Sequence, residues 1–267
     1  MNIINFITGE GYKIISYPDG EKHLKIDDLD LKKEVRIECR ITNSDDLFIL
    51  MQLSDILNRL EVKVHLLKIW YLMGMRCDRL FSTNEAFTLK LVANVINSFN
   101  SEIVEVIEPH SSRTRDLIDK VDLYYDTELY SMIESHNNSH IICLPDNGAV
   151  KRYGWVDKRI ICEKTRDVST GELKGFAIKY KSENMSCDKI MVVDDLCDGG
   201  GTFVGIAELL RKEYNPKELC LAVVHAVQEE GLKRVASVYD KVYITNSYRD
   251  WHKWSELPNN VHVQQIV

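Results

Sequence analysis

The chain has 267 residues, of which 45% are hydrophobic and 28% charged, and its formal net charge is −7. This composition is typical of a soluble globular protein, and the length allows one large domain or two of ordinary size. The negative charge weighs against binding to a nucleic acid polymer, which depends on neutralising many phosphates. No apolar run approaches the roughly 20 residues that cross a bilayer, so no membrane partner is expected.

Short apolar runs rich in Val and Ile alternate with helical patterns along most of the chain. The predicted strands are 62–70, 102–108, 140–144, 159–162, 189–193, 218–224 and 241–245, and the predicted helices are 45–60, 83–99, 202–214 and 229–239. In the helix at 202–214, Phe203, Ile206 and Leu210 recur at the spacing of one apolar face. Buried strands that alternate with helices predict an α/β fold with mostly parallel sheets flanked by helices.

The number of predicted strands is large enough for two sheets in tandem. A polar stretch at 134–139 separates a helical segment from the next strand. We therefore expect an N-terminal domain at 1–138 and a C-terminal domain at 139–267.

The seven cysteines occur singly, at positions 39, 77, 143, 162, 187, 197 and 220. An odd number without a closely spaced pair argues against both a disulfide framework and a zinc site. The N-terminus also lacks the basic start and apolar stretch of a secretory signal. A reducing, cytoplasmic location is the expectation.

The strongest local pattern lies at 189–202, which reads KIMVVDDLCDGGGT. An apolar strand ends in two acids, Asp194 and Asp195, and is followed by a turn made of Asp198, Gly199, Gly200, Gly201 and Thr202. The ends of parallel strands open onto the ligand crevice, where paired carboxylates can accept hydrogen bonds from ribose hydroxyls. The glycines allow N–H groups and the start of the next helix to approach a phosphate. A turn built only for tight helix packing is the alternative interpretation of the glycines.

This string resembles the ribose-5-phosphate loop of type I phosphoribosyltransferases and of ribose-phosphate pyrophosphokinases, the PRPP synthetases. Segments of the latter family are matched in order along nearly the whole chain. The matched segments are YPDGE at 17–21, RCDR at 76–79, PHSS at 109–112, PDNGAVKR at 145–152, and EKTR at 163–166. Each has an ordinary explanation when taken alone, as a turn, a solvated face or core packing. Their common order favours the PRPP synthetase family, and the family's fold implies two tandem type I phosphoribosyltransferase-like domains.

The resemblance implies a role for each matched residue. Tyr17, Asp19 and Glu21 would help to hold the adenine of ATP, often across a subunit boundary, so that a homo-oligomer of at least two subunits is expected. Arg76, Asp78 and Arg79 would bind the ATP phosphates, and His110 and Asp146 would be ligands of the catalytic Mg2+. Lys164 and Arg166, on a mobile catalytic loop, would act with His110 in catalysis. Asp194, Asp195 and the 198–202 turn would bind the ribose phosphate.

The implied reaction is an Mg2+-dependent transfer of diphosphate from ATP to the anomeric hydroxyl of a 5-phosphorylated ribose, with release of AMP. Cys77 replaces the family's Gln, the turn has glycines where a hydroxyl residue is usual, and the last helix of the family is missing. The strings DDLC at 194–197 and GGTF at 200–203 look closest to the divergent phage-type branch, in which case the protein acts in the host cytoplasm. They leave two acceptors open: ribose 5-phosphate, giving PRPP, and ADP-ribose, giving ADP-ribose pyrophosphate for NAD synthesis.

Two other functions remain open from the sequence. A phosphoribosyltransferase would consume PRPP without ATP and would leave the segments at 17–21 and 76–79 without a role. A catalytically inactive regulatory partner of a PRPP synthetase is disfavoured because His110, Asp146, Lys164 and Arg166 are all present.

Overall fold

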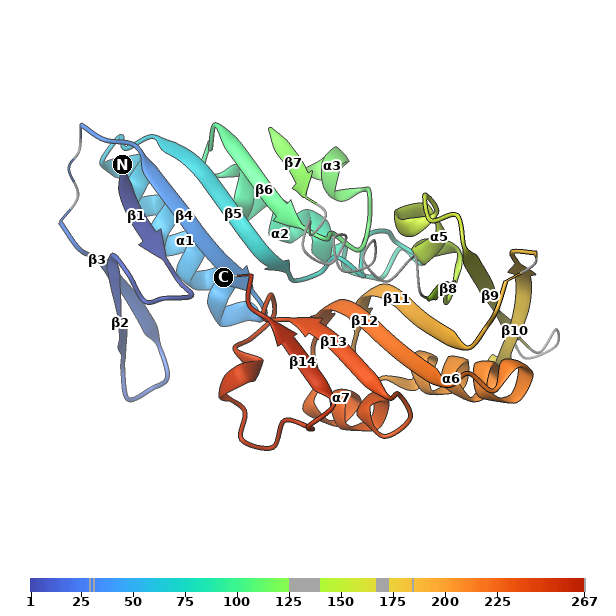
Figure 1. Cartoon of the computed structure of the whole chain (residues 1–267). Coiled ribbons are helices and arrows are strands. Elements are labelled where there is room, and N and C mark those ends of the chain that lie inside the picture. Colours follow the sequence, from blue (N-terminus) through green and yellow to red (C-terminus); the bar gives the residue numbers. More distant parts are fainter. Residues whose placement is uncertain (29, 31, 125–139, 167–172, 184, 267) are drawn as a thin grey trace. The chain divides into compact units, whose positions relative to one another are not determined.

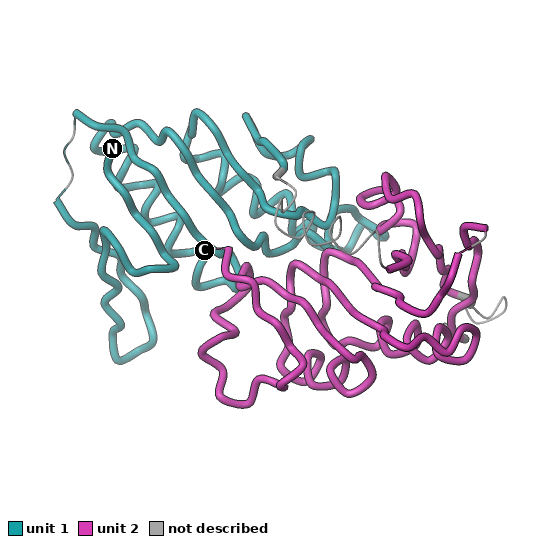
Figure 2. Tube along the Cα trace, viewed as in Figure 1, with its two compact units in different colours: residues 1–125 teal, residues 126–267 magenta. Residues whose placement is uncertain are grey.

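The computed structural model describes residues 1–28, 30, 32–124, 140–166, 173–183 and 185–266. The side chains of residues 124, 165, 166, 173 and 174 lie outside this described part. The chain divides into two compact units, Met1–Tyr125 and Asp126–Val267 (Figure 2). The polar stretch at 134–139, where we expected the domain boundary, lies outside the described residues.

Unit 1 contains a five-stranded parallel sheet in the order β1-β4-β5-β6-β7 (Figure 1). Its strands are β1 (Asn2–Asn5), β4 (Val35–Ile41), β5 (Val64–Leu72), β6 (Ile103–Ile107) and β7 (Val121–Tyr124), and its helices are α1 (Ser44–Arg59), α2 (Thr88–Asn97) and α3 (Thr114–Leu117). In β4 the residues at every second position are fully buried, because successive side chains of a strand point to opposite faces. One face of the sheet thus forms the apolar core of this unit.

An antiparallel hairpin, β2 (Tyr12–Ser16) and β3 (Lys22–Ile26), extends from unit 1 and contacts α1. The Gln52 side chain accepts a hydrogen bond from Leu24 N at 2.8 Å and donates one to Lys22 O at 2.9 Å. Asn43 caps α1, since its side chain accepts from the N–H groups of Asp45 and Asp46. The hairpin is therefore anchored to a helix whose start is fixed by its own sequence.

Unit 2 contains a seven-stranded sheet in the order β10-β9-β8-β11-β12-β13-β14, parallel except for the β9–β10 pair. The strands are β8 (Ile141–Leu144), β9 (Arg159–Arg166), β10 (Leu173–Lys181), β11 (Lys189–Cys197), β12 (Glu218–Ala226), β13 (Lys241–Thr245) and β14 (Val261–Gln264). The helices are α5 (Asn147–Tyr153), α6 (Gly201–Tyr214) and α7 (Glu229–Ala236), and a 3-10 turn η1 covers Trp251–Lys253.

Apolar residues of unit 2 cover both faces of its sheet. In β11, Val192 belongs to a core cluster that includes residues of α6 and α7, while its neighbours Met191 and Val193 belong to a second cluster that includes residues of α5. The chain order also reverses in the middle of the sheet, since β8 leads to β9 on one side and β11 leads to β12 on the other. In an open α/β sheet, ligands bind beyond the carboxyl ends of the strands at such a switch point.

The predicted α/β class with mostly parallel sheets is confirmed, and the helix at 202–214 coincides closely with α6. The strands β1, β4, β7, β10 and β14, the hairpin and α5 are not among the predicted elements. The predicted helix at 83–99 is wrong at its start, because α2 begins at Thr88. Ser82 accepts hydrogen bonds from Asn84 N and Glu85 N instead, so this segment forms a local turn. None of the described helices combines the length and the apolar character needed to span a bilayer.

Candidate functional site

The acid pair predicted from sequence lies in β11, beside the switch point of unit 2. Asp194 and Asp195 are 8% and 1% exposed, respectively. Two adjacent buried carboxylates repel one another and have lost their hydration, so they need a compensating cation. The cation is Arg152, whose Nη2 donates to Asp194 Oδ1 at 2.7 Å and to Asp195 Oδ1 at 2.6 Å. Each carboxyl keeps acceptor positions beyond its bond to Arg152, and Asp194, the more exposed of the two, is the acid that a sugar hydroxyl reaches first.

Arg152 received no role in the sequence analysis, although its segment was matched. It lies on α5, which begins after Asp146 caps the helix through hydrogen bonds from Gly148 N and Ala149 N. The available signal was chemical: two consecutive acids inside an apolar strand predict a buried cation nearby. The sequence did not indicate which of the many arginines and lysines this would be.

Asp194 is expected to make the stability of unit 2 depend on pH. Burial of the carboxyl, followed by the charge of Asp195, raises the pKa of Asp194 from 3.8 to about 7. Below about pH 4 both the folded and the unfolded chain hold the proton of Asp194, and between about pH 4 and about pH 7 only the folded chain holds it. The free energy of unfolding should therefore fall as the pH rises from about 4 to about 7. In denaturant unfolding, Asp194→Asn should show a smaller decrease over this range than the wild type, and an equal decrease would contradict the assignment.

Asp146 and Lys164 come together beside the switch point. Asp146 follows β8, and Lys164 lies near the end of β9, the strand that pairs with β8. Lys164 Nζ is 3.5 Å from Asp146 Oδ2, and each side chain is about one-third exposed. Both charged groups are thus accessible while remaining close to each other. The side chain of Arg166, predicted to act with Lys164, lies outside the described residues.

The glycine turn at 198–202 packs against α7 and leads into α6. Gly200 has φ of 75°, a left-handed conformation that favours glycine, and caps the start of α6. A Cβ atom on Gly231 of α7 would lie only 1.8 Å from Asp198 O, so the turn and the helix are in close backbone contact. Arg234 Nη1 also donates to Gly199 O at 2.7 Å. The alternative interpretation, that the turn glycines serve tight packing, therefore explains Gly200, which packs against Gly231 of α7.

Gly201 is not explained by packing, because a Cβ atom placed there would meet no atom within 4 Å. It is the first residue of α6, and its N–H belongs to the helix N-terminus that attracts anions. We expect Gly201→Ala to unfold at the wild-type temperature or slightly above, because alanine restricts the unfolded chain. The same variant should bind the sugar phosphate at least about tenfold more weakly if that space belongs to the phosphate, a loss of about 1.4 kcal/mol.

Gly231→Ala is the matched control for this prediction. Its methyl group would overlap the backbone of Asp198, and such overpacking typically costs about 1–3 kcal/mol of stability. Thermal unfolding and acceptor KM of both variants separate the two roles. An unchanged acceptor KM in Gly201→Ala would show that this space does not hold the phosphate, and a loss of stability would assign Gly201 to packing.

In unit 1, the segment 76–79 follows β5 and is held by an arginine–carboxylate pair. Arg79 donates from Nε and Nη2 to the two oxygens of Asp78, each at 2.8 Å. Ser111, just beyond β6, donates to Asp78 Oδ2 at 2.6 Å. Hydrogen bonds from Arg79 and from Ser111 hold the pKa of Asp78 at about 2. Asp78 thereby joins the Arg76–Arg79 segment to the segment that contains His110, which is itself exposed.

Tyr17, Asp19 and Glu21 lie in the turn of the β2–β3 hairpin. The hydrogen bonds of this turn are local, from Tyr17 N to Glu21 O at 2.9 Å and from Glu21 N to Asp19 Oδ1 at 3.1 Å. Tyr17 is exposed, with 46% of its surface accessible. The structure therefore places these residues on a different element of unit 1 from Arg76, Asp78 and Arg79.

Of the two expected ligands of Mg2+, Asp146 supplies the kind of oxygen donor that this ion prefers. Mg2+ is usually held by one or two carboxylates, with phosphate and water oxygens as the remaining ligands. Asp146 uses Oδ1 to cap α5, while Oδ2 lies toward Lys164 on an accessible surface. His110 follows β6 and is exposed. The accessible carboxylate of Asp146 leaves most coordination positions to phosphate and water oxygens.

Two units, each with a mostly parallel sheet and helices packed against it, define an α/β protein of two compact units. The solved structure of phosphoribosylpyrophosphate synthetase from Mycobacterium smegmatis shares this fold, with a TM-score of 0.78, 17% identity, and coverage of 100% of this chain and 95% of that one. No protein-family model matches the chain.

Curated relatives identify the family. A ribose-phosphate pyrophosphokinase from Campylobacter jejuni is 30% identical over 245 residues, which cover 86% of this chain and 77% of the relative. Enzymes of the same name from Mycoplasma genitalium and Sulfolobus acidocaldarius are 28% and 24% identical; the matches cover 86% of this chain in both cases and 73% and 82% of the relatives. The chain belongs to the ribose-phosphate pyrophosphokinase family and is an enzyme of this transferase class, as predicted.

Proposed function

We propose that this enzyme transfers the terminal diphosphate of ATP to the anomeric hydroxyl of ribose 5-phosphate. The new bond joins the anomeric oxygen to the β-phosphorus, the bond from that phosphorus to the α–β bridging oxygen breaks, and AMP leaves with the bridging oxygen. The hydroxyl proton passes to solvent. Family membership supports the reaction, and the observation that carries it is the Arg152-held acid pair beside the glycine turn of unit 2.

Residues of unit 2 account for the acceptor. Asp194 and Asp195 accept hydrogen bonds from the vicinal hydroxyls of the ribose, and Arg152 keeps the two carboxylates in place. The N–H groups at the start of α6 bind the 5-phosphate. Lys164 and Arg166 contact the transferring diphosphate and stabilise the charge that develops on it and on AMP.

Residues of unit 1 account for the nucleotide. Arg76 and Arg79 bind the phosphates of ATP, and Asp78 orients the Arg79 guanidinium through two hydrogen bonds. Tyr17, Asp19 and Glu21 hold the adenine, and their place on a hairpin turn suits a base site completed by a second subunit. His110 and Asp146 would hold Mg2+, which would supply charge neutralisation at the phosphates.

ADP-ribose is the second candidate acceptor. No atom lies within 4 Å of a Cβ placed at Gly201, and this open position is where a phosphate that continues into an adenylyl group would enter. With this acceptor the product is ADP-ribose pyrophosphate, a compound suited to NAD synthesis.

Incubation with Mg2+, ATP and each acceptor in turn, followed by measurement of AMP and of the sugar product, tests the function. AMP formation that depends on ribose 5-phosphate supports the proposal, and AMP formation only with ADP-ribose transfers it to the second acceptor. If AMP forms with neither ribose 5-phosphate nor ADP-ribose, diphosphate transfer is contradicted. Consumption of PRPP with a base and without ATP would instead identify a phosphoribosyltransferase.

A further inference from the structure

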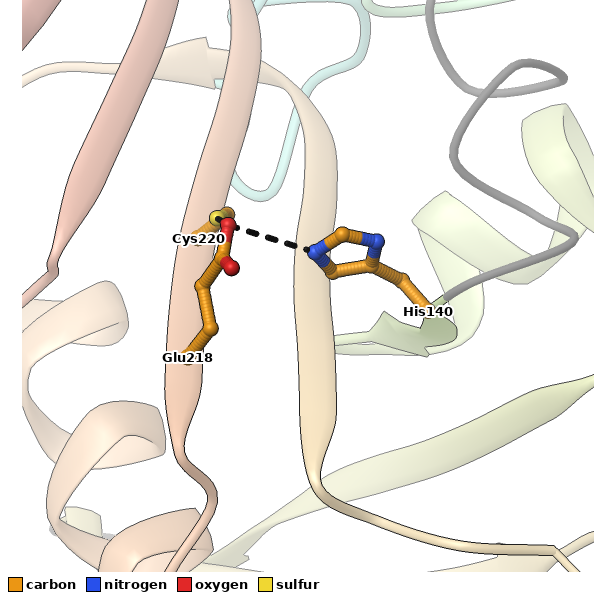
Figure 3. A group of neighbouring side chains, drawn as sticks. All are labelled: His140, Glu218 and Cys220. Carbon is orange, nitrogen blue, oxygen red and sulfur yellow. Dashed lines mark hydrogen bonds and ion pairs between the residues drawn. The ribbon is translucent and has the colours of Figure 1, made fainter.

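Three side chains of different chemistry meet where β8 and β12 begin. His140 directly precedes β8, and Glu218 and Cys220 lie two positions apart in β12, so that they point to the same face of the sheet. Both strands pair with β11. His140 is 5% exposed and Cys220 fully buried. Figure 3 shows the imidazole of His140 directed toward Glu218 and Cys220.

The separations of these groups match those of ligands around one small ion. His140 Nε2 is 3.6 Å from Glu218 Oε1, and Cys220 Sγ is 3.5 Å from the same oxygen. The three ligand atoms all lie within 4.8 Å of one another. In a tetrahedral zinc site, bonds of about 2.0–2.3 Å separate neighbouring ligand atoms by about 3.3–3.6 Å. A small closure of the cluster therefore gives three ligands with correct spacing.

The donor set selects the class of ion. Thiolate and imidazole suit Zn2+ and its transition-metal neighbours, whereas Mg2+ prefers oxygen ligands. A thiolate and a carboxylate together balance the charge of a divalent ion, and the proton of the thiol is released to solvent on binding. Two lysines oppose this binding: Lys241 Nζ lies 3.0 Å from Glu218 Oε1, and Lys189 Nζ lies 3.5 Å from Oε2.

We propose that His140, Glu218 and Cys220 form a binding site for a divalent ion of the Zn2+ class at the N-terminal ends of the parallel strands of unit 2. The sequence argued against a zinc site because it lacks closely spaced cysteines, but these ligands come from separate strands and include a single cysteine. The ion connects β8 to β12 across β11 and leaves a fourth position for water. The acid pair and the glycine turn lie toward the opposite ends of these strands, so this binding is separate from the proposed reaction.

Cobalt substitution tests the site, because a cysteine ligand produces a thiolate-to-cobalt charge-transfer absorption in the near ultraviolet. The intact chain, dialysed against excess Zn2+ and then against buffer, should retain one ion per chain, and Co2+ should give the thiolate band. Cys220→Ser should abolish the band, whereas Cys77→Ser, which removes an exposed thiol, should keep it. Failure to bind either ion, or a band that survives in Cys220→Ser, would overturn the proposal.

Two further variants keep the test decisive if Cys220→Ser does not fold. Glu218→Gln retains the size of the side chain and should weaken Zn2+ binding by at least about tenfold. Loss of a partner that only supports a ligand already lowers metal affinity by about this factor, and loss of a ligand lowers it at least as far. Lys241→Gln removes a competitor for Oε1 and a like charge, and should tighten binding. Equal affinity in the wild type and both variants would place the ion elsewhere and refute the site.

Discussion

Arg152→Ala is expected to lower the free energy of unfolding of unit 2 by about 3–5 kcal/mol, the range for a buried ion pair that loses one partner. The guanidinium is bonded to both Asp194 and Asp195, and all three side chains are largely buried. Its removal leaves two adjacent carboxylates without a cation. Thermal and denaturant unfolding, monitored by a signal that arises from unit 2, measure this loss of unfolding free energy.

A comparison of single and double variants isolates the interaction. Asp194→Asn reduces the repulsion that Arg152 relieves, so the double variant Arg152→Ala with Asp194→Asn should be more stable than the sum of the single effects indicates. Arg211→Ala is the matched control, because Arg211 contacts Val238 O and the exposed Asp240 rather than a buried acid. Arg211→Ala should change stability by no more than about 1 kcal/mol.

The same variant tests the proposed role in acceptor binding. Without Arg152, the two carboxylates move apart or take up protons, so the diol loses its acceptors. The acceptor KM should rise more than the KM of ATP, and Arg152→Lys should restore part of the affinity by returning the charge. Equal changes in both KM values would indicate a structural role alone.

The acid pair and the glycine turn of the site could be predicted from the sequence because their residues are nearly consecutive. The strand, the acid pair and the glycine turn occupy 189–202, and the structure has β11 and α6 there. Strand β4 was missed because its sequence, VRIECRI, alternates charged and apolar residues. Such an alternation is typical of a strand with one buried face and one face that is more polar, whereas the predictions relied on continuous apolar runs.

Features that depend on strand order could not be predicted. The position of β11 next to β8 creates the switch point, and the core clusters on the two faces of the sheet draw on helices from distant parts of the chain. Arg152 meets Asp194 across 42 positions of sequence, and His140 meets Cys220 across a longer separation. Such contacts follow from the tertiary fold and leave no periodic signal in the chain. The use of Gly231 as a close-packing position on α7 was missed for the same reason.

Lys164→Ala is expected to lower kcat for AMP release by about a hundredfold to a thousandfold, the loss typical of one donor that stabilises charge in the transition state. Lys164 lies near the end of β9 with its Nζ 3.5 Å from Asp146 Oδ2, so its charge is accessible at the switch point of unit 2. Charge on the diphosphate and on AMP increases as the bond to the leaving group breaks. An interaction that strengthens at this stage affects kcat more than KM.

The stability of Lys164→Ala should be close to that of the wild type, because accessible ion pairs contribute little to folding. Lys179→Ala, which removes an exposed lysine from the neighbouring strand β10, is the control and should retain full activity. The double variant Lys164→Ala with Arg166→Ala should lose less than the product of the two single losses if both side chains stabilise the same charge. An unchanged kcat in the double variant would show that neither residue is catalytic, and a rise in the KM of ATP alone would assign Lys164 to ground-state binding.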